Sequence, residues 1–462
     1  MPGSGSEAIR ALPGMADTIV AIATPAGRGA IAMVRLSGPR AVEIAMRHTD
    51  PWNGRPNEIH LAEIRDADAN LLDKALVSVF AAPHSFTGED VVEVSSHGGQ
   101  VVPQSIVAAF IASGARQAEP GEFTRRAVAN GKLDMVQAEA IADLVDARSR
   151  SMQKNALSQL DGALSRRIMK LRDSILQLEA FLAYDIDFPE EDDGPISREK
   201  IVRQAEETIA ALRLLIATGS AGELVREGAV VVIAGPPNVG KSSLFNALLG
   251  HSRAIVTEIP GTTRDALEAL VDAGDFAIRL VDTAGLRESE DYVERLGIEV
   301  SRKYLAAADV VLACADSELE LDETIRALRA ITSARIVPVL TKIDLVTKRD
   351  KSTPAADESI RISTLSGEGV ERLLEEIQRV LAEENPVPLD TPLITRARHL
   401  SAVKHAADEL AEFVSAWSST GIPSTVTAIH VRSAAHALEE LIGVVDVEHV
   451  LDVVFSSFCV GK

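Results

Sequence analysis

The sequence of 462 residues has few cysteines, no long apolar run and a deficit of positive charge. Two cysteines are too few for a disulfide framework and favour a reducing compartment. No run of about 18 apolar residues occurs, so we predict no membrane span. The first residues lack the basic and apolar regions of a secretion signal, and we therefore expect a cytoplasmic protein. The net charge of −21 argues against wrapping of nucleic acid by bulk electrostatics, although a local basic patch or a basic partner could still contact RNA.

One short stretch, Gly235–Ser243, carries the clearest chemistry. It reads Gly-Pro-Pro-Asn-Val-Gly-Lys-Ser-Ser, follows the apolar run Val230–Ala234 and leads into apolar residues at helical spacing. Strand, glycine-bounded loop and helix are the context of a phosphate-binding G-x-x-x-x-G-K-[ST] loop. The glycines let successive N–H groups point at phosphate oxygens, Lys241 can reach the β- and γ-phosphates, and Ser242 can ligate Mg²⁺. The alternative, a chance glycine-rich turn, is disfavoured by the flanking strand and helix.

Two later motifs point to the phosphates and the metal. A threonine of Gly261-Thr-Thr-Arg-Asp265 can ligate Mg²⁺ and sense the γ-phosphate. Asp282-Thr-Ala-Gly285 follows a predicted strand, where Asp282 can hold the metal through water and the Gly285 N–H can contact the γ-phosphate.

Two further motifs point to guanine. In Thr341-Lys-Ile-Asp344 the carboxylate of Asp344 can accept from both N–H groups of guanine, which adenine cannot match, and the Lys342 stem can lie along the base. Ser363-Thr-Leu365 can supply a backbone N–H to the guanine oxygen.

These five elements occur in the order and spacing of the Ras-like GTPase superfamily, which this part of the chain resembles. Two positions depart from that pattern. Thr341 stands where the guanine motif usually has Asn, so we expect GTP to bind, but more weakly. Leu286 stands where Ras-like switches have the Gln that orients the attacking water, so other groups must position that water. The predicted GTP-binding residues are Asn238, Val239, Gly240, Lys241, Ser242, Ser243, Thr257, Glu258, Ile259, Pro260, Gly261, Thr262, Thr263, Asp282, Thr283, Ala284, Gly285, Thr341, Lys342, Asp344, Ser363, Thr364 and Leu365.

Hydrophobic patterning divides the chain into α+β, helical and α/β regions. We predict an N-terminal α+β domain at 15–131, a first helical part at 132–222, an inserted doubly wound Ras-like domain at 223–385 and a second helical part at 386–462. The last part includes expected helices at 399–417, 426–442 and 448–455, which cannot bury their apolar faces alone. They are expected to pack on the first helical part, the alternative being a separate C-terminal domain.

Longer motifs give a closer resemblance over nearly the whole chain. Ser85-Phe-Thr-Gly-Glu-Asp90, Pro120-Gly-Glu-Phe-Thr-Arg-Arg-Ala127, Gly285-Leu-Arg-Glu288 and the terminal Phe455-Ser-Ser-Phe-Cys-Val-Gly-Lys462 together resemble the MnmE (TrmE) family of bacterial tRNA-modification GTPases, one of the TrmE-Era-Septin-like GTPases. The resemblance implies GTP hydrolysis during addition of the 5-carboxymethylaminomethyl group to the wobble uridine of certain tRNAs. It also implies a homodimer through the N-terminal domain and a heterotetramer with an FAD-dependent MnmG (GidA) partner.

The resemblance also assigns ions and catalytic groups. It implies potassium-dependent pairing of the GTPase domains, with K⁺ in place of an arginine finger, and places Glu294 as the residue that positions the water. Lys241 and Cys459 complete the candidate catalytic residues; Cys459 is either a redox or catalytic thiol or a small buried residue beside Phe455 and Phe458. The implied ligands are Asn238, Thr257, Ile259 and Thr262 for K⁺, and Ser242 and Thr263 for Mg²⁺.

The N-terminal domain of this family binds 5-formyl-tetrahydrofolate, and Arg35, Glu93, Lys132 and Lys462 match the contacting positions. Basic side chains suit the glutamate tail of that ligand, and Glu93 suits the donors of its pterin ring. The GTPase motifs alone leave open a second function, that of a regulatory switch that binds the ribosome or another effector. The folate-matching residues and the Cys459–Lys462 tail favour tRNA modification, because a switch has no need of them.

Overall fold

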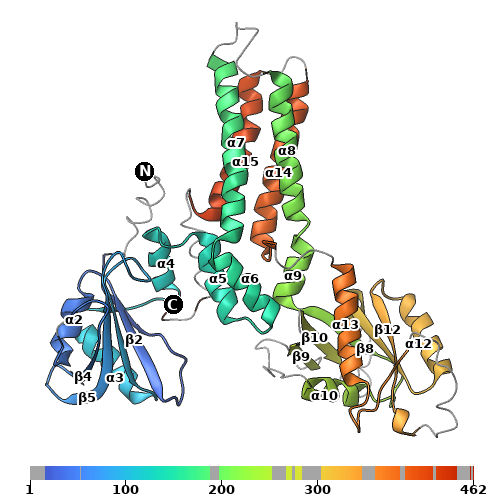
Figure 1. The fold of residues 1–462 in the computed structure, drawn as a ribbon, viewed down its shortest axis with the longest axis horizontal. Helices are drawn as coiled ribbons and strands as arrows, with labels where there is room; N and C mark the ends of the chain where they lie inside the picture. Colours follow the sequence, from blue (N-terminus) through green and yellow to red (C-terminus); the bar gives the residue numbers. More distant parts are fainter. Residues whose placement is uncertain are drawn as a thin grey trace, which may run out of the picture. The chain divides into compact units, whose positions relative to one another are not determined.

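The computed structural model describes residues 16–52, 54–187, 197–251, 267–272, 276–282, 303–345, 359–385, 391–419, 423–444, 458 and 461. Within them the chain forms two β-sheets and a set of long helices (Figure 1). The mixed α/β and α architecture confirms the predicted fold class.

The N-terminal region forms a seven-stranded sheet in the order β3-β4-β5-β6-β2-β1-β7. Helices α2 (Ala41–His48) and α3 (Val101–Ala112) pack on one face of it, where Ile44, Ile106 and Phe110 are fully buried. The opposite face leaves Ile59, Leu61 and Leu76 exposed, and Leu61 pairs directly with Leu76 across the strands. The strands are β1 (Ile19–Ile22), β2 (Ile31–Ser37), β3 (Thr49–Asp50), β4 (Ile59–Arg65), β5 (Leu71–Phe80), β6 (Val91–His97) and β7 (Arg116–Gln117).

A buried ion network fixes the short helix α4 (Glu122–Ala129). The Arg126 guanidinium, with no exposed side-chain surface, donates to Glu122 at 3.0 Å and to Glu89 at 3.1 Å. Glu122 also accepts from Arg116 at 2.7 Å and from the Glu119 N–H at 2.8 Å. Every partner of the Glu122 carboxylate is a donor, so the pKa of Glu122 lies below its ordinary value although burial alone would raise it.

The helical region begins with α5 (Met135–Val145), α6 (Arg150–Leu160), α7 (Ala163–Asp187) and α8 (Arg198–Ile216), followed by α9 (Gly219–Glu227). Sequence periodicity indicates one apolar stripe from Leu157 to Leu182, and the structure corrects this. The helix breaks at Gly162, whose φ of +79° favours glycine, and Leu157 on the first side of the break is exposed.

The two helices after the α/β region return to the first helical part. Helix α15 (Ser424–Ile442) packs along α7, and α14 (Ala397–Ser418) lies beside α8 at the end where Arg198 stacks on the Trp417 ring at 4.4 Å (Figure 1). Segments far apart in the sequence therefore share one core, as expected for helices that cannot bury their faces alone. The third expected helix, at 448–455, lies outside the described residues.

One helical stretch, Arg198–Glu227, is long and apolar enough to cross a bilayer by length and composition. More than half of its most apolar window, 56%, is buried inside the protein, as in a core helix of a bundle, so it is weak evidence for a membrane span.

The α/β region forms a six-stranded sheet in the order β13-β12-β11-β8-β10-β9. All neighbouring pairs are parallel except β9 with β10. Helices α10 (Lys241–His251) and α13 (Val370–Glu384) bury their apolar residues in the core on one face, and α12 (Glu318–Arg329) in the core on the other, so the sheet is doubly wound as predicted. Its strands are β8 (Ala229–Ala234), β9 (Leu267–Asp272), β10 (Ala277–Asp282), β11 (Val310–Ala315), β12 (Arg335–Leu340) and β13 (Ile360–Arg361).

The chain enters and leaves this sheet region at one place. Gly222 in α9 lies so close to the Ile394 backbone that an added Cβ would be 1.9 Å from its carbonyl oxygen. The Ile394 N–H donates to the Thr218 hydroxyl at 3.1 Å. The segments before β8 and after α13 are thereby tied together, which is the arrangement expected of a region inserted into a longer helical one.

Candidate functional site

The phosphate loop follows the carboxyl end of the fully buried strand β8. An added Cβ on Gly235 would lie 2.1 Å from the Cys314 carbonyl oxygen, so only glycine allows the loop to pass this close to β11. Asn238, with φ of +60°, and Gly240, with φ of +97°, both have left-handed backbones. A non-glycine residue in that conformation is uncommon and is found where a loop is held for a function.

The loop delivers two polar side chains to the start of α10. The buried Lys241 ammonium donates to the carbonyl oxygens of Gly235 at 3.0 Å and Pro236 at 2.6 Å, so it lies folded over the loop. The Ser242 hydroxyl donates to Asp282 Oδ2 at 2.7 Å. Hydroxyl and carboxylate oxygens are the donors that Mg²⁺ prefers, and the phosphate loop and the end of β10 bring one of each together.

The base-recognition end is built from the ends of β12 and β13. The buried Thr341 hydroxyl lies 2.5 Å from the Val239 carbonyl oxygen and 3.1 Å from that of Ala315. Lys342 has φ of +57°, and its ammonium pairs with Asp316 at 3.2 Å. The residues of this end therefore hold the phosphate loop as well as one another.

The predicted guanine acceptor is held in place but open to a ligand. Ser363 is buried and its hydroxyl donates to Asp344 Oδ1 at 2.7 Å, while Asp344 itself is exposed. Beside it Thr364 is half-buried and Leu365 is 86% exposed. A fixed, solvent-facing carboxylate next to a free loop is the arrangement needed to accept from the two N–H groups of a guanine.

Several predicted site residues lie outside the described residues, and the structure places none of them. They are Thr257, Glu258, Ile259, Pro260, Gly261, Thr262, Thr263, Thr283, Ala284, Gly285, Glu294, Cys459 and Lys462.

A second cluster lies on the N-terminal sheet. Arg35 on β2 pairs with Glu93 on the neighbouring β6, through Nε at 2.8 Å and Nη2 at 2.7 Å. The guanidinium also lies 5.7 Å from the ring centres of both Phe86 and Phe123. An arginine between two aromatic faces is fixed in direction and keeps its charge. Three of the four predicted folate contacts are thus described, since Lys132 is placed with its ammonium 3.0 Å from the Pro83 carbonyl oxygen.

The C-terminal tail comes to the same sheet. An added Cβ on Gly461 would lie 2.3 Å from the Ile22 carbonyl oxygen, at the end of β1. Strand β1 pairs with β2, with Ala21 opposite Arg35. The residue before Lys462 therefore lies on the strand next to the Arg35 cluster.

Sequence reasoning missed Phe86, Phe123 and Asp316 as parts of these sites. The two phenylalanines stand in the motifs Ser85–Asp90 and Pro120–Ala127, so the motifs contain a signal for them, but only the fold brings both rings to one arginine. Asp316 follows β11 directly, and the carboxyl end of a central parallel strand is the position that could have indicated it.

A doubly wound, mostly parallel sheet, a phosphate loop after its β8 strand, a serine–aspartate contact beside that loop and the Asp344 motif after β12 are together typical of a P-loop GTPase. Comparison with known protein families then shows which family of GTPases the chain belongs to. The profile of the MnmE helical domain matches residues 135–459, and that of the GTP-binding protein TrmE N-terminus matches residues 18–132. The chain belongs to the MnmE family.

Curated relatives agree over almost the full length. The tRNA modification GTPase MnmE of Moorella thermoacetica is 42% identical, with 96% of this chain and 99% of that protein covered. The protein of the same name from Aquifex aeolicus is 38% identical, with 97% of this chain and 100% of that protein covered.

Solved structures of domains of an iron transporter also match. The G domain of the T. maritima FeoB iron transporter is 26% identical, with 34% of this chain and 97% of that chain covered and a TM-score of 0.24. The cytosolic domain of the same transporter in its GMPPNP form is 21% identical, with 46% and 98% covered and a TM-score of 0.25.

Proposed function

We propose that this chain hydrolyses GTP as one component of the cytoplasmic reaction that adds the 5-carboxymethylaminomethyl group to the wobble uridine of certain tRNAs. The observation that carries the proposal is the presence of two separate sites in one chain. A GTPase site lies on the six-stranded sheet, and the Arg35–Glu93 cluster lies on the other sheet. A GTPase that acts only as a switch needs the first site and has no use for the second.

The experiment replaces the gene in its own host and measures wobble-uridine modification in total tRNA. We expect loss of the modification on deletion, its return with the wild-type gene, and no return with Lys241→Ala or Arg35→Ala. Unchanged modification in the deletion strain would refute the proposal.

The GTPase site fits Mg²⁺ and K⁺. Ser242 would hold Mg²⁺ together with Thr263, and Asp282 would bind it through water, which fits the 2.7 Å contact between Ser242 and Asp282. Asn238, held in a left-handed backbone at the loop tip, would be one of the K⁺ ligands together with Thr257, Ile259 and Thr262. The K⁺ ion would supply positive charge near the phosphates in place of an arginine finger.

Within that site Lys241 binds and neutralises the phosphates, and Glu294 orients the attacking water, because Leu286 cannot. The test compares GTP turnover in K⁺ and in Na⁺ for the wild type, Asn238→Ala and Glu294→Ala. We expect faster turnover in K⁺ that Asn238→Ala abolishes, and low turnover with retained GTP affinity for Glu294→Ala. Equal rates in the two salts would remove the K⁺ assignment, and full turnover in Glu294→Ala would place the water elsewhere.

The second site fits 5-formyl-tetrahydrofolate. Arg35 offers a fixed positive charge to a carboxylate tail, the faces of Phe86 and Phe123 suit a flat ring, and Glu93 can accept from ring N–H groups. Lys132 and Lys462 would add positive charge. Binding of labelled 5-formyl-tetrahydrofolate should fall in Arg35→Ala and Glu93→Ala but not in Arg40→Ala, whose exposed side chain pairs with Glu43. Undiminished binding in Arg35→Ala and Glu93→Ala would show that the folate site lies elsewhere.

The partners follow from the same family. We infer a homodimer through the N-terminal region and a heterotetramer with an MnmG (GidA)-type FAD protein, acting on tRNA. The exposed apolar side chains of Ile59, Leu61 and Leu76 on the open face of the sheet support the dimer, since such a patch usually marks an interface. Leu61→Glu should convert the dimer to a monomer in sedimentation experiments, and an unchanged mass would exclude this face.

A further inference from the structure

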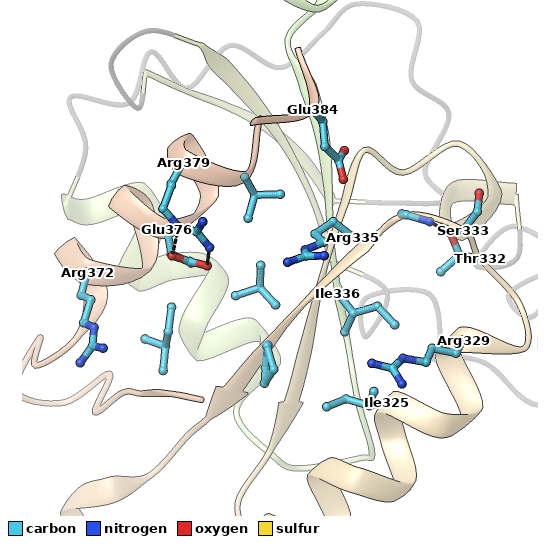
Figure 2. Close-up of a pocket in the computed structure, with 15 residues that line it drawn as sticks. Ile325, Arg329, Thr332, Ser333, Arg335, Ile336, Arg372, Glu376, Arg379 and Glu384 are labelled. Carbon is cyan, nitrogen blue, oxygen red and sulfur yellow. Dashed lines mark hydrogen bonds and ion pairs between the residues drawn. The ribbon is translucent and has the colours of Figure 1, made fainter. Parts of the chain in front are cut away.

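A basic cavity of about 790 Å³ lies at the amino end of strand β12, between α12 and α13 (Figure 2). Four arginines line it, Arg329, Arg335, Arg372 and Arg379, against two carboxylates, Glu376 and Glu384. The cavity is thus positive in a chain whose net charge is −21.

On the α13 side of the cavity, Arg379 already has carboxylate partners within the protein. Arg379 donates to Glu376 from Nε at 2.9 Å and from Nη2 at 2.6 Å, and it also pairs with Glu383. The hydrogen bond from Arg379, and then the charges of Arg379, Arg335 and Arg372, hold the pKa of Glu376 below its ordinary value although its burial opposes this. Arg379 alone contacts this carboxylate, whereas Arg335 and Arg372 act on it only through their charges.

The other three arginines differ from Arg379 in their contacts. Among the described residues, the side chains of Arg329, Arg335 and Arg372 make no hydrogen bond or ion pair. Arg329 and Arg335 extend toward the open space from α12 and β12 (Figure 2). Because a guanidinium cannot lose its proton, all three side chains stay charged, and their N–H groups are free to donate to an anionic ligand.

The cavity is separate from the GTPase site. The phosphate loop and the guanine motif follow the carboxyl ends of β8 and β12, whereas Arg335 is the first residue of β12. Parallel strands place these ends at opposite edges of the sheet. An anion in the cavity would therefore not compete with GTP.

The sheet edge beside the cavity disfavours a peptide strand as the ligand. Among the residues that the structure describes, strand β13 pairs only with Val339 and Leu340, and no strand pairs with the first half of β12 at that edge. The Leu340 carbonyl faces β13, so Pro338, two residues earlier, faces the same edge and has no N–H to donate. An added strand would lack that hydrogen bond, whereas forked guanidinium groups match phosphate oxygens.

We propose that Arg329, Arg335 and Arg372 form a phosphate-binding pocket for the backbone of tRNA on the GTPase domain. The proposal rests on the proposed function, in that tRNA is taken as the substrate. It supplies the local basic patch that an acidic chain needs in order to contact RNA.

The test measures binding of a fluorescent tRNA transcript to the full-length protein as a function of KCl concentration. The variant is R329A/R335A, and the control is R203A/R326A, which removes two exposed arginines outside the cavity. For R329A/R335A we expect affinity about tenfold weaker at ~0.1 M salt and a plot of log K against log salt less steep by about two, one for each phosphate contact. The control should keep the wild-type affinity and slope, and both variants should keep wild-type GTP affinity.

Equal tRNA affinity and slope for R329A/R335A and wild type would overturn the proposal, as would absence of tRNA binding by the wild type. A variant that loses affinity for polyglutamate or inorganic phosphate but keeps its affinity for tRNA would assign the cavity to another anion and overturn it as well. The deletion experiment decides the proposed function independently. If modification persists in that strain while the pocket still binds tRNA, the proposed function fails and the pocket stands.

Discussion

The Thr341 hydroxyl donates to the Val239 carbonyl oxygen at 2.5 Å, and so links the guanine motif to the phosphate loop. Both residues are almost fully buried, at 2% exposure each. Thr341 stands where an Asn is usual, and in this chain its hydroxyl makes the contact to the loop. What threonine cannot supply is a side-chain amide for the base.

Removing this hydroxyl should weaken GTP binding. Thr341→Val leaves the Val239 carbonyl without its buried donor, at a cost of about 1–3 kcal/mol, which corresponds to about 5- to 150-fold lower affinity if all of it is lost from binding. Thr341→Asn should bind GTP at least as tightly as the wild type. The GTP affinities of both variants are measured by titration with a fluorescent guanine nucleotide and by its displacement with unlabelled GTP. Thr324→Val, which removes a hydroxyl bonded to Glu320 on α12, is the control, and wild-type affinity in Thr341→Val would show that the link is dispensable.

The contact between Ser242 and Asp282 predicts how GTP binding depends on Mg²⁺. Ser242→Ala should remove most of the difference in GTP affinity between Mg²⁺ and EDTA buffers, because the metal loses a hydroxyl ligand. Ser242→Thr should retain that difference. Thr324→Val on α12 again serves as the control, and a Ser242→Ala protein with wild-type Mg²⁺ dependence would contradict the assignment.

The buried Glu122 network predicts a loss of stability in acid. The folded-state pKa of Glu122 is depressed, so its contribution is present above the unfolded pKa of about 4.3 and is lost as the pH falls through the folded value. At pH 7, Glu122→Gln should lower the local opening free energy of α4 by about 3 kcal/mol, because Arg126 loses a buried partner.

Hydrogen exchange of peptides covering α4 and β1 measures this free energy. The difference between wild type and Glu122→Gln should shrink as the pH falls below about 4. Glu43→Gln, which breaks an exposed pair, should change little at any pH. A difference that stays constant with pH would mean that charge is not the cause.

Cys314 should be chemically silent in the folded protein. It is fully buried in β11, and this burial raises the pKa of its thiol to about 12. Almost no thiolate exists near neutral pH, and the thiolate is the reactive form. A Cys459→Ser variant should therefore take up no maleimide at pH 7.5 until urea unfolds it, whereas rapid labelling of the native variant would contradict the burial.

The parts of the fold that sequence predicted best are those with one dominant pattern. Strand β8 is buried on both faces, and the apolar run Val230–Ala234 therefore identifies it to within one residue of its bounds, Ala229–Ala234. Strand β9, Leu-Glu-Ala-Leu-Val-Asp, gives no such signal, because an antiparallel edge strand mixes charged and apolar residues. The break at Gly162 was missed because the apolar spacing continues across it.

In the candidate sites, too, some residues can be predicted from the local sequence and others cannot. Lys241, Ser242 and Asp344 lie in contiguous motifs, so local sequence identifies them. The contacts that complete the sites join residues far apart in the chain, as between Arg35 and Phe123 or between Thr341 and Val239. No spacing rule encodes such pairs, because only the register of the sheets and the loop paths bring them together.

The pairing of α7 with α15 has a consequence for synthesis of the chain on the ribosome. Roughly 240 residues separate the two helices, and at 5–20 residues per second α7 waits about 12–50 s for its partner to be made. The six-stranded domain can fold in that interval, while α7 has α8 beside it but still lacks α15. A chain that ended after α13 would therefore carry a finished GTPase domain and a helical region without α14 and α15.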